Sequence, residues 1–141
     1  MATLFTRIID GELPGTFVWR DEECVAFLSI NPLRPGHTLV VPRAELDHWI
    51  DLSPEAARHL FTVSRTIGRA QQQAFQPARI GVLIAGLEVP HAHLHLIPMR
   101  READLHLSNA APSVEPDELE RNAASIRAAL RDQGAEGVAD A

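Results

Sequence analysis

The chain has 141 residues, the length of one ordinary domain with a core of its own. Its 13 basic and 19 acidic residues give a formal net charge of −6, which argues against a surface that binds a nucleic-acid backbone. No apolar run is long enough for a membrane span, and the N-terminus does not resemble a signal peptide, so we expect a cytoplasmic protein. The single cysteine excludes an intrachain disulfide, and the absence of lysine excludes a lysine nucleophile.

The N-terminal part of the chain predicts a short helix followed by three strands. The apolar residues Leu4, Phe5, Ile8 and Ile9 recur at helical spacing. Gly11, a typical helix stop, follows them. Runs of β-branched and aromatic residues then predict strands at 16–20, 24–30 and 37–41. Pro42 ends the third strand. The lone cysteine, Cys24, lies in the second run, where a small buried core residue is expected.

A long helix and two further strands follow. Ser53-Pro54-Glu55 combines a capping serine, a proline at the first helical position and an acidic first turn. The helix is expected to run to about Phe75, with an inward face that includes Phe61 and Gln71. Strands are expected over residues 79–85 and 93–97, and Pro98 is expected to end the second.

The C-terminal residues differ in character from the rest of the chain. A linker at 112–116 leads into an amphipathic helix, and the chain is expected to fray from Gly134 onward. Strands without regular helical crossovers indicate an α+β domain with an antiparallel sheet over residues 1–111. Residues 112–141 are then a linker and helical extension.

The informative segment is His91-Ala92-His93-Leu94-His95-Leu96. In a strand, successive side chains alternate between faces, so His91, His93 and His95 point one way while Ala92, Leu94 and Leu96 point into the core. His37 opens another predicted strand after a Pro-Gly turn, well placed to lie alongside.

Three interpretations of this pattern compete. The histidines could be incidental on a surface strand, although three alternating histidines in one apolar strand are a rare coincidence. They could ligate a metal such as zinc, but no acidic residue is an obvious further ligand. The third interpretation is nucleophilic catalysis at phosphorus, because a neutral imidazole is a competent nucleophile and neighbouring imidazoles supply hydrogen-bond donors.

The segment resembles the histidine triad (HIT) signature, His-x-His-x-His followed by two apolar residues. Residues 4–14, 26–32 and 35–42 also resemble the family's N-terminal stretch and central block, so the likeness spans roughly residues 3–100. It implies a HIT-like fold, with an antiparallel sheet of about five strands, one long helix and a C-terminal helix. It also implies a homodimer joined through the long helix and a sheet edge.

The resemblance implies a role for each histidine. His93 would be the nucleophile that becomes nucleotidylated, and His95 would hydrogen-bond the α-phosphate oxygens. His91 would orient His93, partly through its backbone carbonyl, and His37 would complete the proton network near the leaving group. Six apolar residues match positions that enclose the nucleobase and ribose: Leu4, Phe5, Ile8, Phe27, Ile30 and Leu39.

The chain departs from the family at two places near this site. Ser29 stands where an acid or asparagine often contacts the ribose. The bacterial-type segment Gly86-Leu87-Glu88-Val89-Pro90 stands where many members have Gly-Gln-x-Val, and Leu87 cannot donate a hydrogen bond. Glu88 is a candidate substitute proton donor, and the leaving group is left open.

The expected function is therefore a hydrolase or nucleotidyl transferase acting on a purine nucleotide or nucleotide conjugate. It would resemble a phosphoramidase or dinucleoside polyphosphate hydrolase, with no cofactor and no metal. Neither nucleic acid nor a membrane is expected as a partner. Two alternatives remain open at this stage: a nucleotide-binding regulatory module with little turnover, and a histidine-ligated metal site.

Overall fold

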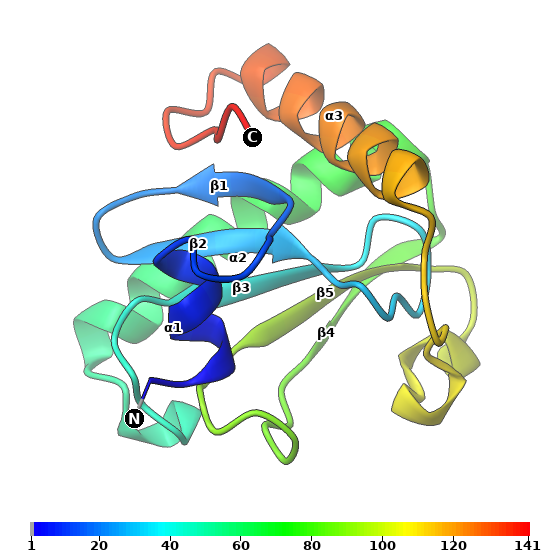
Figure 1. The fold of residues 1–141 in the computed structure, drawn as a ribbon. Coiled ribbons are helices and arrows are strands. Elements are labelled where there is room, and N and C mark those ends of the chain that lie inside the picture. Colours follow the sequence, from blue (N-terminus) through cyan, green and yellow to red (C-terminus); the bar gives the residue numbers. More distant parts are fainter. Residues whose placement is uncertain (1) are drawn as a thin grey trace.

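A computed structural model describes residues 2–141 and shows one five-stranded sheet in which all neighbouring strands are antiparallel (Figure 1). The strands are β1 (Phe17–Arg20), β2 (Cys24–Leu28), β3 (Thr38–Pro42), β4 (Arg79–Leu83) and β5 (Leu94–Met99). Their order across the sheet is β1-β2-β3-β5-β4. The predicted α+β class and the five-stranded antiparallel sheet are confirmed.

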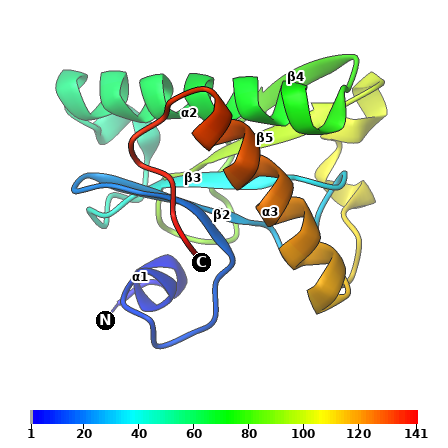
Figure 2. The ribbon, with the colours of Figure 1, turned by 90° about the horizontal axis from the view of Figure 1, so that it is seen from above.

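Three α-helices accompany the sheet: α1 (Leu4–Ile9), α2 (Pro54–Phe75) and α3 (Pro116–Asp132). Short 3-10 turns lie at Trp49–Asp51, Glu102–Leu105 and Leu107–Asn109. Figure 2 shows α2 on one face of the sheet and α1 on the other. Within residues 2–141, no helix combines the length and apolar character that crossing a bilayer requires.

Local sequence explains where α2 begins and ends. The Ser53 hydroxyl accepts a hydrogen bond from the Ala56 backbone N–H, and Pro54 occupies the first position, where its missing N–H costs nothing. The helix ends at Phe75, and the capping residue Gln76 has a left-handed conformation with φ 49°. The half-exposed Phe61 is an exception to the expected inward face, because it borders an open groove described below.

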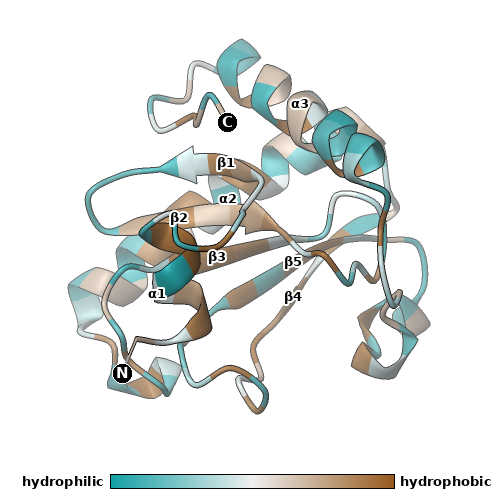
Figure 3. Ribbon diagram, viewed as in Figure 1, coloured by the Kyte–Doolittle hydropathy of each residue, from teal (hydrophilic) through white to brown (hydrophobic). Residues whose placement is uncertain are grey.

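The two faces of the sheet bury separate apolar clusters. The larger one joins β5 to α2 and α3, and includes Leu94, Leu96, Leu60, Ile67, Ile126 and Leu130. The smaller one lies under α1, and includes Phe5, Phe17, Val25, Phe27, Leu39 and Val41. In Figure 3 the central strands are largely apolar, whereas α3 shows both hydrophilic and apolar positions, as expected for a helix with one buried side.

The last residues pair with β1, where the sequence predicted a frayed end. The Ala139 N–H donates to the Val18 carbonyl at 3.0 Å, and the Arg20 N–H donates to the Gly137 carbonyl at 2.9 Å. Ala139 is buried in the smaller apolar cluster. A Cβ at Gly137 would collide with the Trp19 ring, so the glycine permits this close approach.

Strand boundaries near the histidines differ from the prediction. β5 begins at Leu94, because the preceding Ala92 N–H donates to the Leu46 carbonyl at 2.7 Å and leaves the ladder with β3. His91 and His93 therefore lie in the segment that enters β5, and His37 lies directly before β3.

Of the two prolines that were expected to end strands, Pro42 does so and Pro98 does not. Pro42 is the last residue of β3, at its end. Pro98 lies within β5, but the pairing of β5 with β3 extends only to Leu96, so Pro98 has one neighbouring strand, β4. Its missing N–H therefore breaks no ladder on the β3 side. Smaller differences at other ends shorten the predicted strands to Phe17–Arg20, Cys24–Leu28 and Arg79–Leu83.

Candidate active site

Three imidazoles meet where β3 and β5 pair, and His91 adjoins them through its backbone carbonyl. Leu39 of β3 is opposite His95 of β5, and this register brings His37 beside His95 with ring centroids 5.1 Å apart. The rings of His93 and His95 are 4.9 Å apart. His37, His91 and His93 are buried, and His95 is partly exposed. The histidines singled out in the sequence thus form one continuous cluster.

A backbone carbonyl determines which ring nitrogen of His93 carries the hydrogen. The Nδ1 atom lies 2.6 Å from the carbonyl oxygen of His91. A carbonyl can only accept, so in the neutral ring Nδ1 carries the hydrogen and Nε2 has a free electron pair. This is the tautomer that a nucleophile requires.

A second backbone group places the hydrogen on His95. The Leu33 N–H donates to His37 Nδ1 at 3.0 Å, so neutral His37 has its hydrogen on Nε2. That Nε2 lies 2.9 Å from His95 Nδ1, which must then accept. The Nε2 atom of His95 consequently carries a hydrogen. The neighbouring His93 and His95 rings offer a free electron pair and an N–H donor.

Electrostatics keeps these rings neutral. Burial lowers the pKa of His93 below the usual histidine value. Burial, and after it the charge of neighbouring His93, lowers the pKa of His95 to about 4. Burial with the charges of His95 and His93 lowers the pKa of His37 to about 3. At neutral pH the tautomers argued above are therefore the relevant states.

A buried glutamine supports this arrangement, and the sequence predicted only that it lies on the inner face of the long helix. The Gln71 Nε2 donates to the carbonyl of Gly36 at 3.0 Å and to the carbonyl of Leu96 at 3.0 Å. It thereby ties the turn before His37 to the strand that carries His95. Gly36 itself has φ 89°, and a Cβ there would collide with the Phe75 ring.

The predicted nucleobase residues divide into a buried and an exposed group. Phe5, Phe27 and Leu39 are buried together, and the Phe5 ring meets His93 edge-on with centroids 4.8 Å apart. These three residues form an apolar wall beside the imidazoles. Leu4 and Ile30 are exposed, at 47% and 67%, and partly buried Ile8 packs against the wall.

The remaining candidates lie on loops. Ser29 is partly buried, and its hydroxyl accepts from the Asn31 backbone N–H at 3.1 Å. Gly86 has φ 83°, in the loop that leads to His91. Leu87 and Glu88 are both exposed, in contrast to the buried imidazoles.

A separate polar cluster joins the β1–β2 turn to α2. Asp21, Cys24 and His59 place three ligand-type atoms within 4.8 Å of one another. His59 Nε2 lies 2.7 Å from Asp21 Oδ2, which also accepts from the Trp19 indole N–H at 2.8 Å. The Cys24 thiol donates to the same oxygen, and burial raises its pKa. Because these groups already hydrogen-bond to one another, the cluster links the β1–β2 turn to α2.

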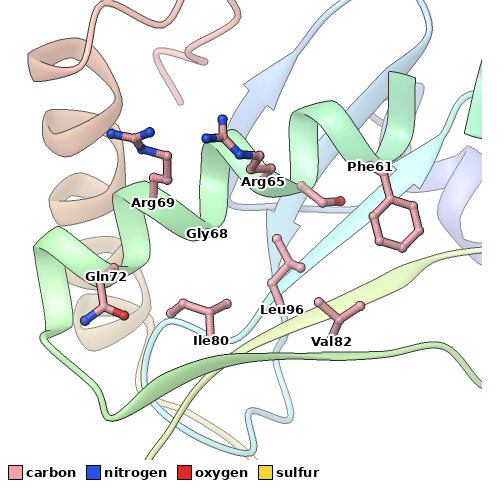
Figure 4. Close-up of a pocket in the computed structure, with 9 residues that line it drawn as sticks. Phe61, Arg65, Gly68, Arg69, Gln72, Ile80, Val82 and Leu96 are labelled. Atoms are coloured by element: carbon pink, nitrogen blue, oxygen red, sulfur yellow. The ribbon is translucent and has the colours of Figure 1, made fainter. Parts of the chain in front are cut away.

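A hollow of about 410 Å³ lies between α2 and β4, away from the imidazoles (Figure 4). Its lining is largely apolar and includes Phe61, Ile80, Val82 and Leu96. Arg65 and Arg69 of α2 border it. None of the four clustered histidines lines this hollow.

Known proteins share both the sequence and the fold. The HIT domain model matches residues 10–102. The chain is 31% identical over 131 residues to the protein hit of Bacillus subtilis, covering 87% of this chain and 90% of that protein. It is 32% identical over 113 residues to the asymmetrical bis(5'-nucleosyl)-tetraphosphatase of Schizosaccharomyces pombe, covering 77% of this chain and 59% of that protein.

A solved structure extends the match to three dimensions. The crystal structure of a zinc-bound histidine triad family protein from Mycobacterium smegmatis has a TM-score of 0.79 at 28% identity, covering 95% of this chain and 96% of that chain. Fold and imidazole cluster together define a histidine triad protein. The chain belongs to the HIT-domain family, and the family resemblance drawn from the sequence is confirmed.

Proposed function

We propose that the protein is a hydrolase or nucleotidyl transferase that acts at the α-phosphate of a nucleoside 5'-phosphate conjugate through a covalent nucleotidyl-His93 intermediate. The observation that carries this proposal is the pair of opposed tautomers: a free electron pair on His93 Nε2 and a hydrogen on His95 Nε2. Attack at phosphorus needs both groups. The electron pair forms the new bond, and the N–H donor stabilises the negative charge that develops on the phosphoryl oxygens.

The proposed reaction has two displacements. The electron pair of His93 Nε2 forms the N–P bond while the bond from phosphorus to the leaving group breaks, and the leaving group takes that bond's electrons and then a proton from solvent. The His91 carbonyl, 2.6 Å from Nδ1, stabilises the resulting cationic ring. Water then attacks phosphorus, the N–P electron pair returns to Nε2, and a mononucleotide and a proton are released.

The surroundings of the imidazoles favour a nucleotide substrate. The apolar wall of Phe5, Phe27 and Leu39 offers a surface for a purine base and the ribose. Ser29 supplies a hydroxyl for the ribose. The chain has a net charge of −6, which disfavours nucleic acid as a partner. We expect its partners to be small nucleotide conjugates in the cytoplasm.

The proposal leaves two classes of leaving group, a polyphosphate and an amine. The name of the fission yeast relative, a tetraphosphatase, favours a polyphosphate leaving group. An amine, as in a phosphoramidase, remains the second choice. Leu87 is exposed and offers no side-chain donor, so we expect leaving groups that need little protonation to react fastest.

A turnover assay with His93→Ala tests this function. We expect a nucleoside phosphoramidate or dinucleoside polyphosphate to be hydrolysed by the wild-type chain, and the rate to fall by at least about a thousandfold in the variant, because the nucleophile is gone. His48→Ala, which removes an exposed histidine outside the cluster, is the matched control and keeps full activity. A variant at His93 that still turns over at the wild-type rate contradicts the proposal.

One alternative is a nucleotide-binding module with little turnover, and the exposed Leu87 in place of a donor is the observation that favours it. Tight nucleotide binding with no hydrolysis of any amine or phosphate conjugate would identify it.

The other alternative is a histidine-ligated metal site, favoured by the zinc-bound relative from Mycobacterium smegmatis. Stoichiometric zinc in the purified protein, lost in His91→Ala, would identify that function instead.

We also propose a homodimer formed through β4 and α2. Within residues 2–141, β4 has a neighbour on one side only, so its outer edge is open. The apolar hollow with half-exposed Phe61 and Val82 lies beside that edge. A second copy of the chain would cover both features.

A further inference from the structure

The side chain of Thr3 contacts both the first helix and the histidine cluster. It is the N-cap of α1, and its Oγ1 accepts a hydrogen bond from the Thr6 N–H at 3.1 Å. The same oxygen lies 2.7 Å from Nδ1 of His91. The Thr3 backbone N–H donates to Oε1 of Glu45 at 3.1 Å, which fixes the position of the capping residue.

The direction of the contact with His91 follows from the other side of the ring. His91 Nε2 lies 2.7 Å from the carbonyl oxygen of Pro42, so the neutral ring has its hydrogen on Nε2. Nδ1 must then accept, and the Thr3 hydroxyl is the donor. That hydroxyl also lies 3.2 Å from Thr6 Oγ1, but it has one hydrogen, and the shorter contact with His91 is the stronger.

We infer that Thr3 is a positioning residue for the nucleophile and acts through His91. With Thr3 and Pro42 bound to its two nitrogens, the buried His91 ring has one tautomer and one orientation. The backbone carbonyl of the same residue accepts from His93 Nδ1 at 2.6 Å and thereby leaves Nε2 of His93 free to attack. The inference rests on the proposed role of His93 as nucleophile.

By this inference, α1 also positions the histidines, in addition to supplying Phe5 to the apolar wall. Phe5, two residues after Thr3, packs its ring on His93 with centroids 4.8 Å apart and lies 5.7 Å from the ring of His91. The helix therefore holds the nucleophile by an aromatic contact and holds His91 by a hydrogen bond. The sequence analysis missed Thr3, because a single polar contact across 88 positions leaves no periodic signal.

Four variants separate this role from simple helix capping. Thr3→Val keeps the shape and removes the hydroxyl. Thr3→Ser restores it. Thr3→Asp keeps a strong N-cap, but an ionised carboxylate cannot donate to His91. Thr6→Val removes the neighbouring hydroxyl on the same helix and is the matched control.

Imidazole ¹⁵N chemical shifts in labelled protein at pH 7 report the tautomers directly. We expect the wild type, Thr3→Ser and Thr6→Val to show His91 with its hydrogen on Nε2 and His93 with its hydrogen on Nδ1. In Thr3→Val the carbonyls of Pro42 and His91 still hold both tautomers, but His91 Nδ1 loses its donor, so its ¹⁵N signal moves toward that of a free acceptor nitrogen. In Thr3→Asp the His91 Nδ1 becomes protonated.

Turnover supplies the second readout. For a nucleoside phosphoramidate, we expect kcat to fall roughly tenfold in Thr3→Val and Thr3→Asp with KM within about twofold, because a misplaced nucleophile slows the bond-forming step more than binding. Thr3→Ser recovers most of the lost rate. A wild-type ¹⁵N shift of His91 Nδ1 in folded Thr3→Val, or wild-type kcat in Thr3→Asp, overturns the inference.

These two readouts also separate the inference from the proposed function. If the wild-type chain hydrolyses no nucleotide conjugate, the proposed function fails, while the ¹⁵N shifts still decide whether the Thr3 hydroxyl donates to His91 Nδ1. If Thr3→Val does not fold, Thr3→Asp keeps the helix cap and decides the question alone.

Discussion

The proposed chemistry rests on two neighbouring rings, His93 with an electron pair on Nε2 and His95 with a hydrogen on Nε2. Each state is set by a backbone group: the His91 carbonyl for the first, and the Leu33 N–H through His37 for the second. Backbone groups do not titrate, so the assignment holds for as long as the rings stay neutral.

The lowered pKa values predict how activity depends on pH. Attack requires neutral His93, and burial lowers the pKa of that ring below its usual value of about 6.5. The active form therefore persists as pH falls through 6.5, and activity is lost only at lower pH. We expect the acid limb of a kcat/KM profile to lie below pH 6.5. A midpoint at or above 6.5 would show that the nucleophile is not held as described.

Turns and helices position these residues at the element scale. Gly36 sets the direction in which the chain enters β3, its carbonyl accepts from Gln71, and its missing side chain makes room for the Phe75 ring of α2. The turn, the helix and the strand are thus fitted to one another beside His37.

Gly36→Ala tests this fit. We expect a loss of about 3 kcal/mol in the free energy of unfolding, since both the positive φ and the collision with Phe75 oppose the change. Gly11→Ala is the matched control, because Gly11 has φ +84° with nothing within 4 Å, and we expect it to cost about 1 kcal/mol. Urea unfolding of both variants measures the difference. Equal losses would mean that Phe75 does not constrain the turn.

Sequence patterns predicted the helices, the strands and the grouping of the histidines, because each depends on short periodic signals. Strict alternation from His91 to Leu96 places the imidazoles on one side, and the Ser53-Pro54 start gives α2 its first residue. Strand ends were less accurate, since β5 begins where a partner strand is available and not where the alternation begins.

Contacts between single residues far apart in the chain could not be predicted from such patterns. Gln71 looks like any polar residue on a helix, although its amide joins Gly36 to Leu96 across the fold. The pairing of residues 137–139 with β1 was missed for the same reason, because a short tail rich in glycine and alanine carries no clear strand period.

The two edges of the sheet differ at the scale of the whole molecule. The tail at 137–139 covers the outer edge of β1. At the other side, β4 has no outer neighbour among the residues that the structure describes, and the apolar hollow beside it exposes Phe61 and Val82. This asymmetry supports the proposed dimer, since an open edge next to an apolar hollow is costly to leave in water.

Val82→Glu tests the proposed interface. We expect the wild type to sediment as a dimer at micromolar concentration and Val82→Glu to shift to monomer, because each copy would bury an unpaired carboxylate against its partner. Ile50→Glu changes another exposed apolar residue, in a 3-10 turn, and leaves the dimer intact. A monomeric wild type, or a Val82→Glu variant that stays dimeric, contradicts this assembly.

The stereochemical course at phosphorus tests for a nucleotidyl-histidine intermediate, since it does not require that intermediate to accumulate. A nucleoside phosphorothioate conjugate of one configuration is hydrolysed in ¹⁸O-labelled water, and the configuration of the product is determined. Attack by His93 followed by attack of water inverts the configuration at phosphorus twice, so we expect net retention. Net inversion would show a single direct attack by water and would contradict a nucleotidyl-histidine intermediate.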